Sequence, residues 1–535
     1  MTSLAPTRKQ RPNAVDQRQT DQSISVVVSR TPPAVERRRL ERFRAKSGSE
    51  TPSELKRRLL RADLRRMAVY DLVCVGCGPA GETAAVTAAH QGFRVLVIEA
   101  AGRPGGAMVN TGTIASKVLR ETALTCSAFR RRPVPGISAT PDTDLSLAAF
   151  MARTTLVQLE EHDRIESELD RAGVEVTHGR AVMAGPNRID VHRADGTVDS
   201  VTTRFTLLAT GSRPARPDWV DFDHPSIVDA DGLLDLPRMP RSIVIIGGGV
   251  IGSEYACIFA ELGIPTTLVE PRKGLMRFLD SEIRDRLQEE MIETGVDLRL
   301  GRKPILVSGK NEVGIVELDD GTRLEAEIVL WSLGRQGNAE SLGIETAGIK
   351  ANDRGLIAVN HEYRTTCPTV FAAGDVIGFP ALASTSIEQG RVAACRMFEF
   401  DDDRALADTV PIGIYTIPAV GHVGLNLEEA GKKGYDAVVG RAEFRRNARG
   451  RMLGDARGLL KLVVDRETEK LLGCSVVGED ATELVHLAQF AISTGQRLGW
   501  FEQACFNYPS LSGLFRDAAD DARVAIIQAS GRAAA

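Results

Sequence analysis

A glycine-rich turn that occurs twice in the same setting constrains this chain more than any other feature. The first copy joins a strand expected over 70–75, a helix over about 80–91 and a strand over 94–98 through Gly76-Cys77-Gly78-Pro79-Ala80-Gly81. The second joins strands expected over 242–246 and 266–269, with a helix to about 262, through Gly247-Gly248-Gly249-Val250-Ile251-Gly252. Glu99 lies 23 residues after Gly76, and Glu270 lies 23 residues after Gly247. The repeat of both context and spacing predicts two nucleotide-binding βαβ units.

Each position in these turns has a physical role in binding a dinucleotide. The first glycine allows a tight turn, the second lets the backbone approach a pyrophosphate, and the third lets the helix pack closely on the strand. The N-terminus of the helix favours the anion, and the acid after the second strand is placed to bind ribose hydroxyls. We therefore predict that FAD contacts Gly76, Gly78, Pro79, Ala80, Gly81 and Glu99, and that NAD(P) contacts Gly247, Gly249, Val250, Ile251, Gly252 and Glu270.

Three further segments agree with two nucleotide units. Residues 208–212 resemble a linker that leaves an FAD unit, and residues 331–335 resemble the strand end that returns to it. Residues 370–375 end in Gly374-Asp375. An isolated Gly-Asp pair is usually a turn, but here it follows an apolar strand at the expected distance. We therefore predict contacts to the cofactors from Thr210, Gly211, Gly334, Arg335, Gly374 and Asp375.

Together these segments resemble the flavoproteins of the pyridine nucleotide-disulfide oxidoreductase family, which includes lipoamide dehydrogenase and glutathione reductase. The resemblance covers about residues 69–525. It implies an α/β fold with two Rossmann-like domains, one for FAD and one for NAD(P), and a C-terminal α/β dimerisation domain. The expected boundaries are an extension over 1–68, an FAD domain over 69–213 and 355–405, an NAD(P) domain over 214–354 and a dimerisation domain over 406–535. The last is expected to contain strands near 460–464 and 473–477 and a helix near 482–494.

The chain departs from disulfide reductases of this family where their redox cysteines stand. The family pattern CxxxxC falls here on Met108 and Thr113. Neither side chain can form a thiolate or a mixed disulfide, and the nearest cysteine, Cys126, lies outside the motif. The family's C-terminal HPxxxE, whose His exchanges protons with the thiol, reads Tyr508 and Gly513 at its first and last positions. We therefore exclude the family's disulfide chemistry.

The groups needed for hydride transfer remain. Lys117 follows Ser116 in an expected helix, and Glu254 lies two residues after Gly252. The resemblance implies that Lys117 and Glu254 pair near flavin and act as catalytic residues. The alternatives are a solvated helix lysine and a carboxylate stabilised by a helix N-terminus. The resemblance adds further cofactor contacts at Ala100, Gly106, Thr111, Gly112, Ser116, Leu382 and Ala383.

Within the family, the run over 105–117, with Tyr508 and residues 413–418, most resembles the soluble pyridine nucleotide transhydrogenases. That branch usually has Cys, Pro, Glu and Glu where Met108, Ala115, Ala419 and Gly513 stand. The resemblance implies a Si-specific NAD(P)+ transhydrogenase, in which FAD carries hydride between NADPH and NAD+. An NAD(P)H:quinone or dye reductase and a non-catalytic FAD- or NAD-binding regulator are the alternatives.

The nucleotide preference stays open at the end of the second unit. Glu270 favours the 2′-hydroxyl of NAD and would repel a 2′-phosphate. Arg272 and Lys273 follow it closely. They either offset that repulsion for NADP or are solvated loop charges.

Composition limits the remaining possibilities. The 535 residues suffice for three to four domains, and 43% hydrophobic with 26% charged residues is typical of a globular protein. No apolar run reaches a membrane-spanning length and no apolar signal core starts the chain, so we expect a cytoplasmic protein. The family resemblance implies a homodimer or a higher homo-oligomer. The eight cysteines predict no disulfide framework, and Cys74 and Cys77 fall in a strand and turn, so no metal site is expected.

Charge is uneven along the chain. Residues 1–66 hold 17 Lys/Arg and 7 Asp/Glu, which gives a net charge of +10. The whole chain has a net charge of −4, so residues 67–535 carry −14. This composition predicts disorder, with a helix conceivable near 52–64. The segment is a solvated tail, a sequence upstream of a start at Met67, or a tail that binds an anionic partner. It does not predict nucleic-acid binding.

Overall fold

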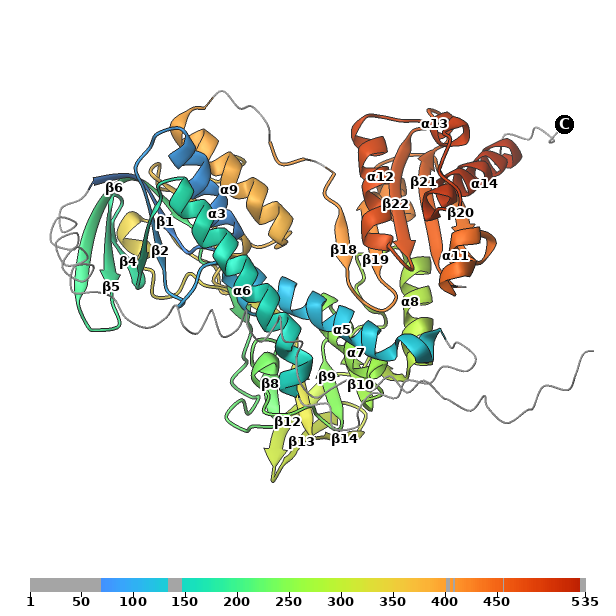
Figure 1. Cartoon of the computed structure of the whole chain (residues 1–535), viewed down its shortest axis with the longest axis horizontal. Coiled ribbons are helices and arrows are strands. Elements are labelled where there is room, and N and C mark those ends of the chain that lie inside the picture. Colours follow the sequence, from blue (N-terminus) through green and yellow to red (C-terminus); the bar gives the residue numbers. More distant parts are fainter. Residues whose placement is uncertain (1–68, 133–146, 401–404, 408, 456, 530–535) are drawn as a thin grey trace, which may run out of the picture.

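The structure is a computed structural model that describes residues 69–132, 147–400, 405–407, 409–455 and 457–529. Three bodies of mixed helices and strands are visible in Figure 1. We name them the first nucleotide body (mainly blue, teal and orange), the second nucleotide body (green and yellow) and the C-terminal body (red). The basic extension and the helix expected near 52–64 lie outside the described residues.

The first nucleotide body is built on a seven-stranded sheet of order β3-β2-β1-β6-β5-β4, with β17 paired to β6. The strands are β1 (Val69–Val75), β2 (Val95–Glu99), β3 (Glu175–His178), β4 (Arg180–Gly185), β5 (Arg188–His192), β6 (Val198–Leu208) and β17 (Val370–Ala372). β1 and β2 are parallel, with Val73 opposite Leu96. Every residue of β2 is buried, as expected for a parallel strand covered on both faces. The helices α3 (Pro79–His90) and α9 (Ala383–Phe398) pack against each other.

The second nucleotide body has a parallel five-stranded sheet of order β11-β10-β9-β15-β8. Its strands are β8 (Ile227–Asp229), β9 (Ile243–Ile246), β10 (Thr266–Glu270), β11 (Val296–Leu300) and β15 (Ile328–Trp331). The helices α7 (Val250–Glu261) and α8 (Ser281–Thr294) belong to it. A small antiparallel sheet of β12 (Pro304–Lys310), β13 (Val313–Leu318) and β14 (Arg323–Ala326) completes it.

The C-terminal body is an antiparallel sheet covered by helices. Its strands are β18 (Ile412–Ile414), β19 (Val420–Gly424), β20 (Ala437–Glu443), β21 (Leu459–Asp465) and β22 (Leu471–Val477), in the order β18-β19-β22-β21-β20. Its helices are α10 (Leu427–Lys432), α11 (Ala448–Leu453), α12 (Ala481–Ser493), α13 (Leu498–Gln503) and α14 (Leu514–Ala529). α12 packs on β19 and β22, and α14 packs on β20 and β21.

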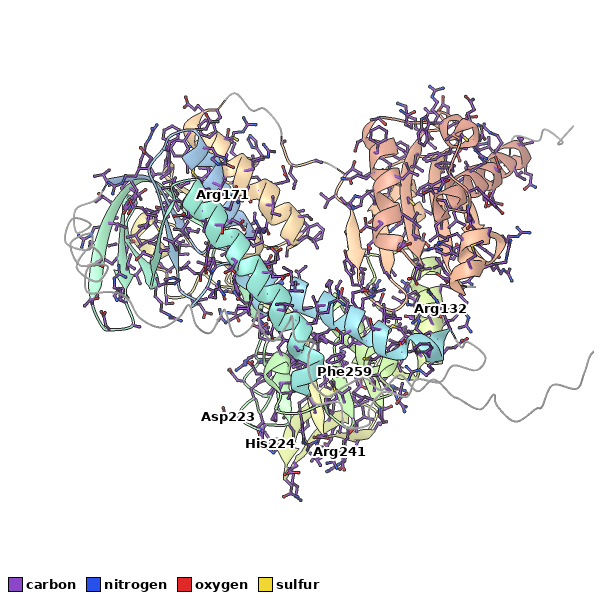
Figure 2. The ribbon with its side chains drawn as sticks, viewed as in Figure 1. Arg132, Arg171, Asp223, His224, Arg241 and Phe259 are labelled. Carbon is purple, nitrogen blue, oxygen red and sulfur yellow. The ribbon has the colours of Figure 1, made fainter. Side chains whose placement is uncertain are left out.

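Two long helices connect the nucleotide bodies. After the short helix α4 (Gly106–Asn110), α5 (Thr113–Arg131) packs against α7, and α6 (Leu147–Arg171) packs against α5. α6 runs from the first nucleotide body toward the second (Figure 1). Figure 2 labels Arg171 at one end of α6 and Phe259 of α7 near the other, where Phe150 shares a buried core with Tyr255 and Phe259.

The short strands β7 (Ser212–Pro214) and β16 (Arg335–Gly337) pair antiparallel where the chain leaves and re-enters the first nucleotide body. Both βαβ units predicted from the sequence are present, and so are the C-terminal strands and helix. The predicted α/β fold with two Rossmann-like units is thus confirmed. The exact domain boundaries stay predictions. Among the described residues, no helix is both long and apolar enough to cross a membrane.

Candidate functional site

The first glycine turn has the shape that a pyrophosphate needs. Gly76 has a φ of +96°, and a Cβ there would lie 2.5 Å from the Ala209 carbonyl oxygen. A Cβ on Gly81 would lie 2.0 Å from the Gly76 oxygen, so both positions require glycine. The space beside Gly78 holds no atom nearer than Gly106 Cα at 3.8 Å from such a Cβ. The backbone at Gly78 is therefore accessible to a ligand.

The second turn repeats this geometry. Gly247 has a φ of +115°, and a Cβ on Gly252 would lie 1.9 Å from the Gly247 oxygen. A Cβ on Gly249 would meet nothing within 4 Å. No side chain caps α3 at Gly78 or α7 at Gly249, so both N-termini keep N–H groups for an anion. Both turns fit a dinucleotide.

The two acids at the strand ends are held alike. Glu99 accepts the backbone N–H of Cys77 at 2.7 Å and of Ala101 at 2.8 Å. Glu270 accepts that of Gly248 at 2.7 Å and of Arg272 at 2.9 Å. Both carboxylates are buried, so each is oriented by its own turn. Each lies at the end of the second strand of its unit, the position from which the sequence predicts a ribose contact.

The Gly374-Asp375 motif lies beside the first glycine turn. A Cβ on Gly374 would lie 3.4 Å from the Ala80 side chain, beside the start of α3. The Gly374 N–H donates to Gln389 Oε1 at 2.8 Å. Leu382 precedes α9 as its N-cap, and Ala383 begins it. The structure thus brings the two motifs predicted for FAD together.

Asp375 is joined to the connection between the nucleotide bodies. The Ser212 hydroxyl donates to Asp375 Oδ2 at 2.7 Å. Arg335 donates to the Ser212 hydroxyl and carbonyl, each at 2.8 Å. Thr210 and Asn338 exchange hydrogen bonds at 2.8 and 2.9 Å. Arg335 therefore faces the first nucleotide body, and its guanidinium is engaged by Ser212.

Lys117 and Glu254 meet, although they are 137 residues apart in sequence. Lys117 Nζ lies 2.7 Å from Glu254 Oε2. The other oxygen, Oε1, accepts the Tyr415 N–H at 2.9 Å, and Lys117 Nζ lies 5.1 Å from the centre of the Tyr415 ring. The Glu254 side chain is 4% exposed and that of Lys117 is 24% exposed. The pair therefore joins all three bodies, with the cation at its more open end.

The turn between α4 and α5 lies directly before Lys117. Gly106 begins α4, Gly112 is the N-cap of α5, and Ser116 Oγ lies 3.2 Å from Lys117 Nζ. Met108 is packed on the core of the first nucleotide body, and Thr113 is exposed. Thr111, between α4 and α5, is half-buried. Ala100, directly after β2, is exposed.

Neither Cys126 nor Cys77 can replace the missing redox pair. Cys126 lies 13 residues after Thr113 in α5, which is about 20 Å along a helix. Burial raises the pKa of Cys126, and burial also raises the pKa of the Cys77 thiol well above its ordinary value. Both thiols are therefore poor nucleophiles.

The C-terminal segment presents Tyr508 at the surface, where it is 81% exposed. Asn447 donates to the Ser510 carbonyl at 3.1 Å, and a Cβ on Gly513 would lie 3.5 Å from Asn447 Nδ2. In the described part of the chain this segment carries no imidazole or carboxylate between Tyr508 and Gly513.

The class of protein follows from comparison with known families. Residues 70–390 match the model of the pyridine nucleotide-disulphide oxidoreductases, and residues 410–519 match the dimerisation domain of the same family. The chain belongs to this family. Its members bind FAD and use NAD(P)H, in agreement with the two nucleotide turns.

Curated relatives identify the branch of the family that this chain resembles. The soluble pyridine nucleotide transhydrogenase of Mycobacterium bovis (strain BCG / Pasteur 1173P2) is 39% identical over 456 residues, covering 85% of this chain and 97% of the relative. That of Colwellia psychrerythraea is 36% identical over 453 residues, covering 84% and 97%. The branch predicted from the run before Lys117 is confirmed by these relatives.

Solved structures share the fold. The Cu(II) complex of the HOCl-induced flavoprotein disulfide reductase RclA from Escherichia coli has a TM-score of 0.78 at 27% identity, covering 85% of this chain and 99% of that one. LpdA from Mycobacterium tuberculosis has a TM-score of 0.78 at 28% identity, covering 84% and 98%.

Sequence reasoning missed the contribution of α6 and of the Tyr415 backbone. The 25 residues of α6 contain no glycine or proline, which is a signal for a long helix. No sequence signal marks a backbone N–H such as that of Tyr415, because only the tertiary fold brings it to Glu254.

Proposed function

We propose that this chain is an FAD-dependent, Si-specific NAD(P)+ transhydrogenase that moves hydride between NADPH and NAD+. The observation that carries the proposal is the site around Lys117: the ion pair with Glu254 is kept while Met108 and Thr113 stand where disulfide reductases have cysteines. The relatives named soluble pyridine nucleotide transhydrogenase support it.

FAD, when bound, supplies a ring that accepts and returns hydride at a nicotinamide. The protein's own part is to bind and position. The N-termini of α3 and α7 would hold the two pyrophosphates, and Glu99 and Glu270 would orient the riboses. Asp375, which accepts from the Ser212 hydroxyl, would bind the ribityl chain.

Lys117 and Glu254 would set the electrostatic environment of the bound flavin ring. The Tyr415 N–H and Lys117 both bind Glu254 and keep its charge in place. Lys117 then presents a fixed cation, which stabilises negative charge on a neighbouring group more strongly than a mobile one. Neither residue needs to take up or release a proton in a hydride transfer.

We further propose that a homodimer in the cytoplasm is the working form. The match to a dimerisation domain over 410–519 supports self-association. In that assembly Tyr508, exposed in the single chain, would be covered by the second copy.

Anaerobic titration of the purified holoenzyme tests the proposal. NADPH is expected to bleach the flavin absorbance, and thio-NAD+ is expected to restore it with turnover. If neither NADPH nor NADH bleaches the flavin absorbance, the proposal is overturned. Faster turnover with a quinone than with thio-NAD+ would assign a quinone reductase instead. A variant starting at Met67 should remain active, and its inactivity would favour a role that needs the basic extension.

A further inference from the structure

The short helix α4 ends directly in front of the site, and a side chain from another helix holds that end. Gln158, half-buried in α6, donates from Nε2 to the Val109 carbonyl at 2.8 Å and to the Asn110 carbonyl at 3.0 Å. The last carbonyls of a helix have no partner inside it. One amide group therefore caps the C-terminus of α4 twice.

A second contact lies one turn along α6. His162, which is buried, makes a hydrogen bond from Nδ1 to the Pro104 carbonyl at 2.8 Å. Since a carbonyl only accepts, Nδ1 carries the proton. Burial lowers the pKa of His162, so the neutral ring is favoured. His162 therefore binds the chain just before α4, and Gln158 binds it at the C-terminus of α4.

The segment also donates one backbone hydrogen bond to the first glycine turn, from the Gly105 N–H to the Cys77 carbonyl at 2.7 Å. Gly105 has a φ of +111°, and a Cβ there would lie 2.6 Å from the Val109 side chain. α4 itself has only five residues. A helix this short has little stability of its own, and its position depends on what packs against it.

The other end of α6 contacts the second nucleotide body. Phe150 shares a core with Tyr255, the residue after Glu254. α6 thus contacts the second nucleotide body at Phe150 and the first at His162, and Gln158 lies between these two residues in the sequence. Seven residues after Asn110, Lys117 reaches Glu254. A shift of the α4–α5 turn would move Lys117 relative to its partner.

We propose that Gln158 is a positioning residue for hydride transfer, acting by holding the turn between α4 and α5 so that Lys117 meets Glu254. In disulfide reductases of the family a cysteine pair closes this turn covalently; here Met108 and Thr113 leave it open, and two hydrogen bonds from α6 fix it. The role in hydride transfer rests on the proposed function, whereas the hold on the turn does not.

The test uses the full-length holoenzyme and three variants. Gln158→Leu removes the amide, and Gln158→Glu keeps the shape but turns an oxygen toward the two carbonyls. Thr155→Val is the control, because among the described residues the Thr155 hydroxyl donates only to the Met151 carbonyl of its own helix, at 3.3 Å. Hydrogen–deuterium exchange is measured without nicotinamide nucleotide, and kcat and KM are measured separately.

Both Gln158 variants are expected to speed exchange of amides over 106–117 about tenfold and to leave α3 unchanged. We expect kcat to fall about ten- to a hundredfold, the scale of a misplaced group, with KM within about twofold, and Gln158→Glu to be the worse variant. The control should match the wild type.

Unchanged exchange over 106–117 would overturn the proposal, and so would a Gln158→Glu enzyme that behaves like the wild type. If either variant fails to fold, Gln158→Lys keeps N–H donors, and fast exchange of 106–117 in this variant would also overturn it. A wild-type chain without transhydrogenase activity would contradict the proposed function but not the hold of Gln158 on the turn, because the exchange experiment needs no turnover.

Discussion

Two lysine–carboxylate pairs join the second nucleotide body to its neighbours, and they differ in what surrounds them. Lys117 meets Glu254 at 2.7 Å with side chains 24% and 4% exposed. Lys461 of β21 meets Asp280 at 2.9 Å with both side chains 5% exposed. The chemistry of the two contacts is the same, but only the first leaves its cation open.

The second pair is satisfied within the protein. Lys461 also lies 3.0 Å from Glu282. Asp280 caps α8 by accepting the N–H of Glu282 at 3.0 Å and of Ile283 at 3.4 Å. A buried charge with this many partners fixes how two bodies pack. The comparison teaches that an ion pair buried at both residues serves the packing of the fold. An ion pair whose cation is partly exposed can also contact a ligand.

Breaking the buried pair should have the largest effect. Lys461→Met leaves Asp280 buried with one partner fewer, and we expect the free energy of unfolding to fall by about 3–5 kcal/mol. Urea denaturation of the holoenzyme measures it, and kcat of the folded fraction should be unchanged. A loss of kcat without loss of stability would reverse the assignment of the two pairs.

Removing the open cation should act on the reaction as well. Lys117→Met is expected to lower kcat about a hundredfold, which is about 2.7 kcal/mol in the barrier. The free energy of unfolding should also fall, because Glu254 stays buried without its cation. The flavin spectrum serves as a check that cofactor is retained. Activity within twofold of the wild type would show that this pair, too, is structural.

Two exposed cations extend the comparison. Arg272 and Lys273 follow Glu270, and in the described part of the chain neither forms an ion pair. If they meet the 2′-phosphate of NADP, replacing both by Ala should raise KM for NADPH about tenfold. Initial rates with NADPH and NADH measure this. An equal rise for both nucleotides would make them general surface charges.

A buried imidazole near the structural pair provides a test by pH. Burial lowers the pKa of His422 below its ordinary value of 6.5, against the opposing charges of Glu429 and Asp280. The unfolded chain therefore binds a proton more readily than the folded one, and stability should decline as pH falls below about 6.5. His422→Gln should flatten that slope in urea titrations between pH 5 and 7, and an unaltered slope would exclude His422.

The smallest effect is expected where both partners face solvent. Arg213 and Glu340 lie 2.6 Å apart with side chains 43% and 61% exposed. Glu340→Gln should change the free energy of unfolding by no more than about 0.5 kcal/mol. A change comparable to that of Lys461→Met would mean that distance, and not burial, governs these pairs.

Much of the fold was predictable because its signals are local. A strand, a glycine turn and a helix N-terminus follow one another within a few residues, so both βαβ units were recognised at Gly76 and Gly247. The absence of thiols at Met108 and Thr113 is also a local fact. These two residues alone exclude disulfide reduction by the family mechanism and leave hydride transfer.

The tertiary structure decided which groups act together. Glu254 is 137 residues from Lys117 and 161 from the Tyr415 N–H that orients it. Gln158 donates to the Val109 carbonyl, 49 residues away, and no sequence pattern in α6 predicts that contact. Short-range spacing determines turns and helix ends, because their hydrogen bonds are local. The burial and partners of a charge arise only when distant segments pack, and for this reason the sequence named Lys117 and Glu254 but could not tell that Lys461 forms the more buried pair.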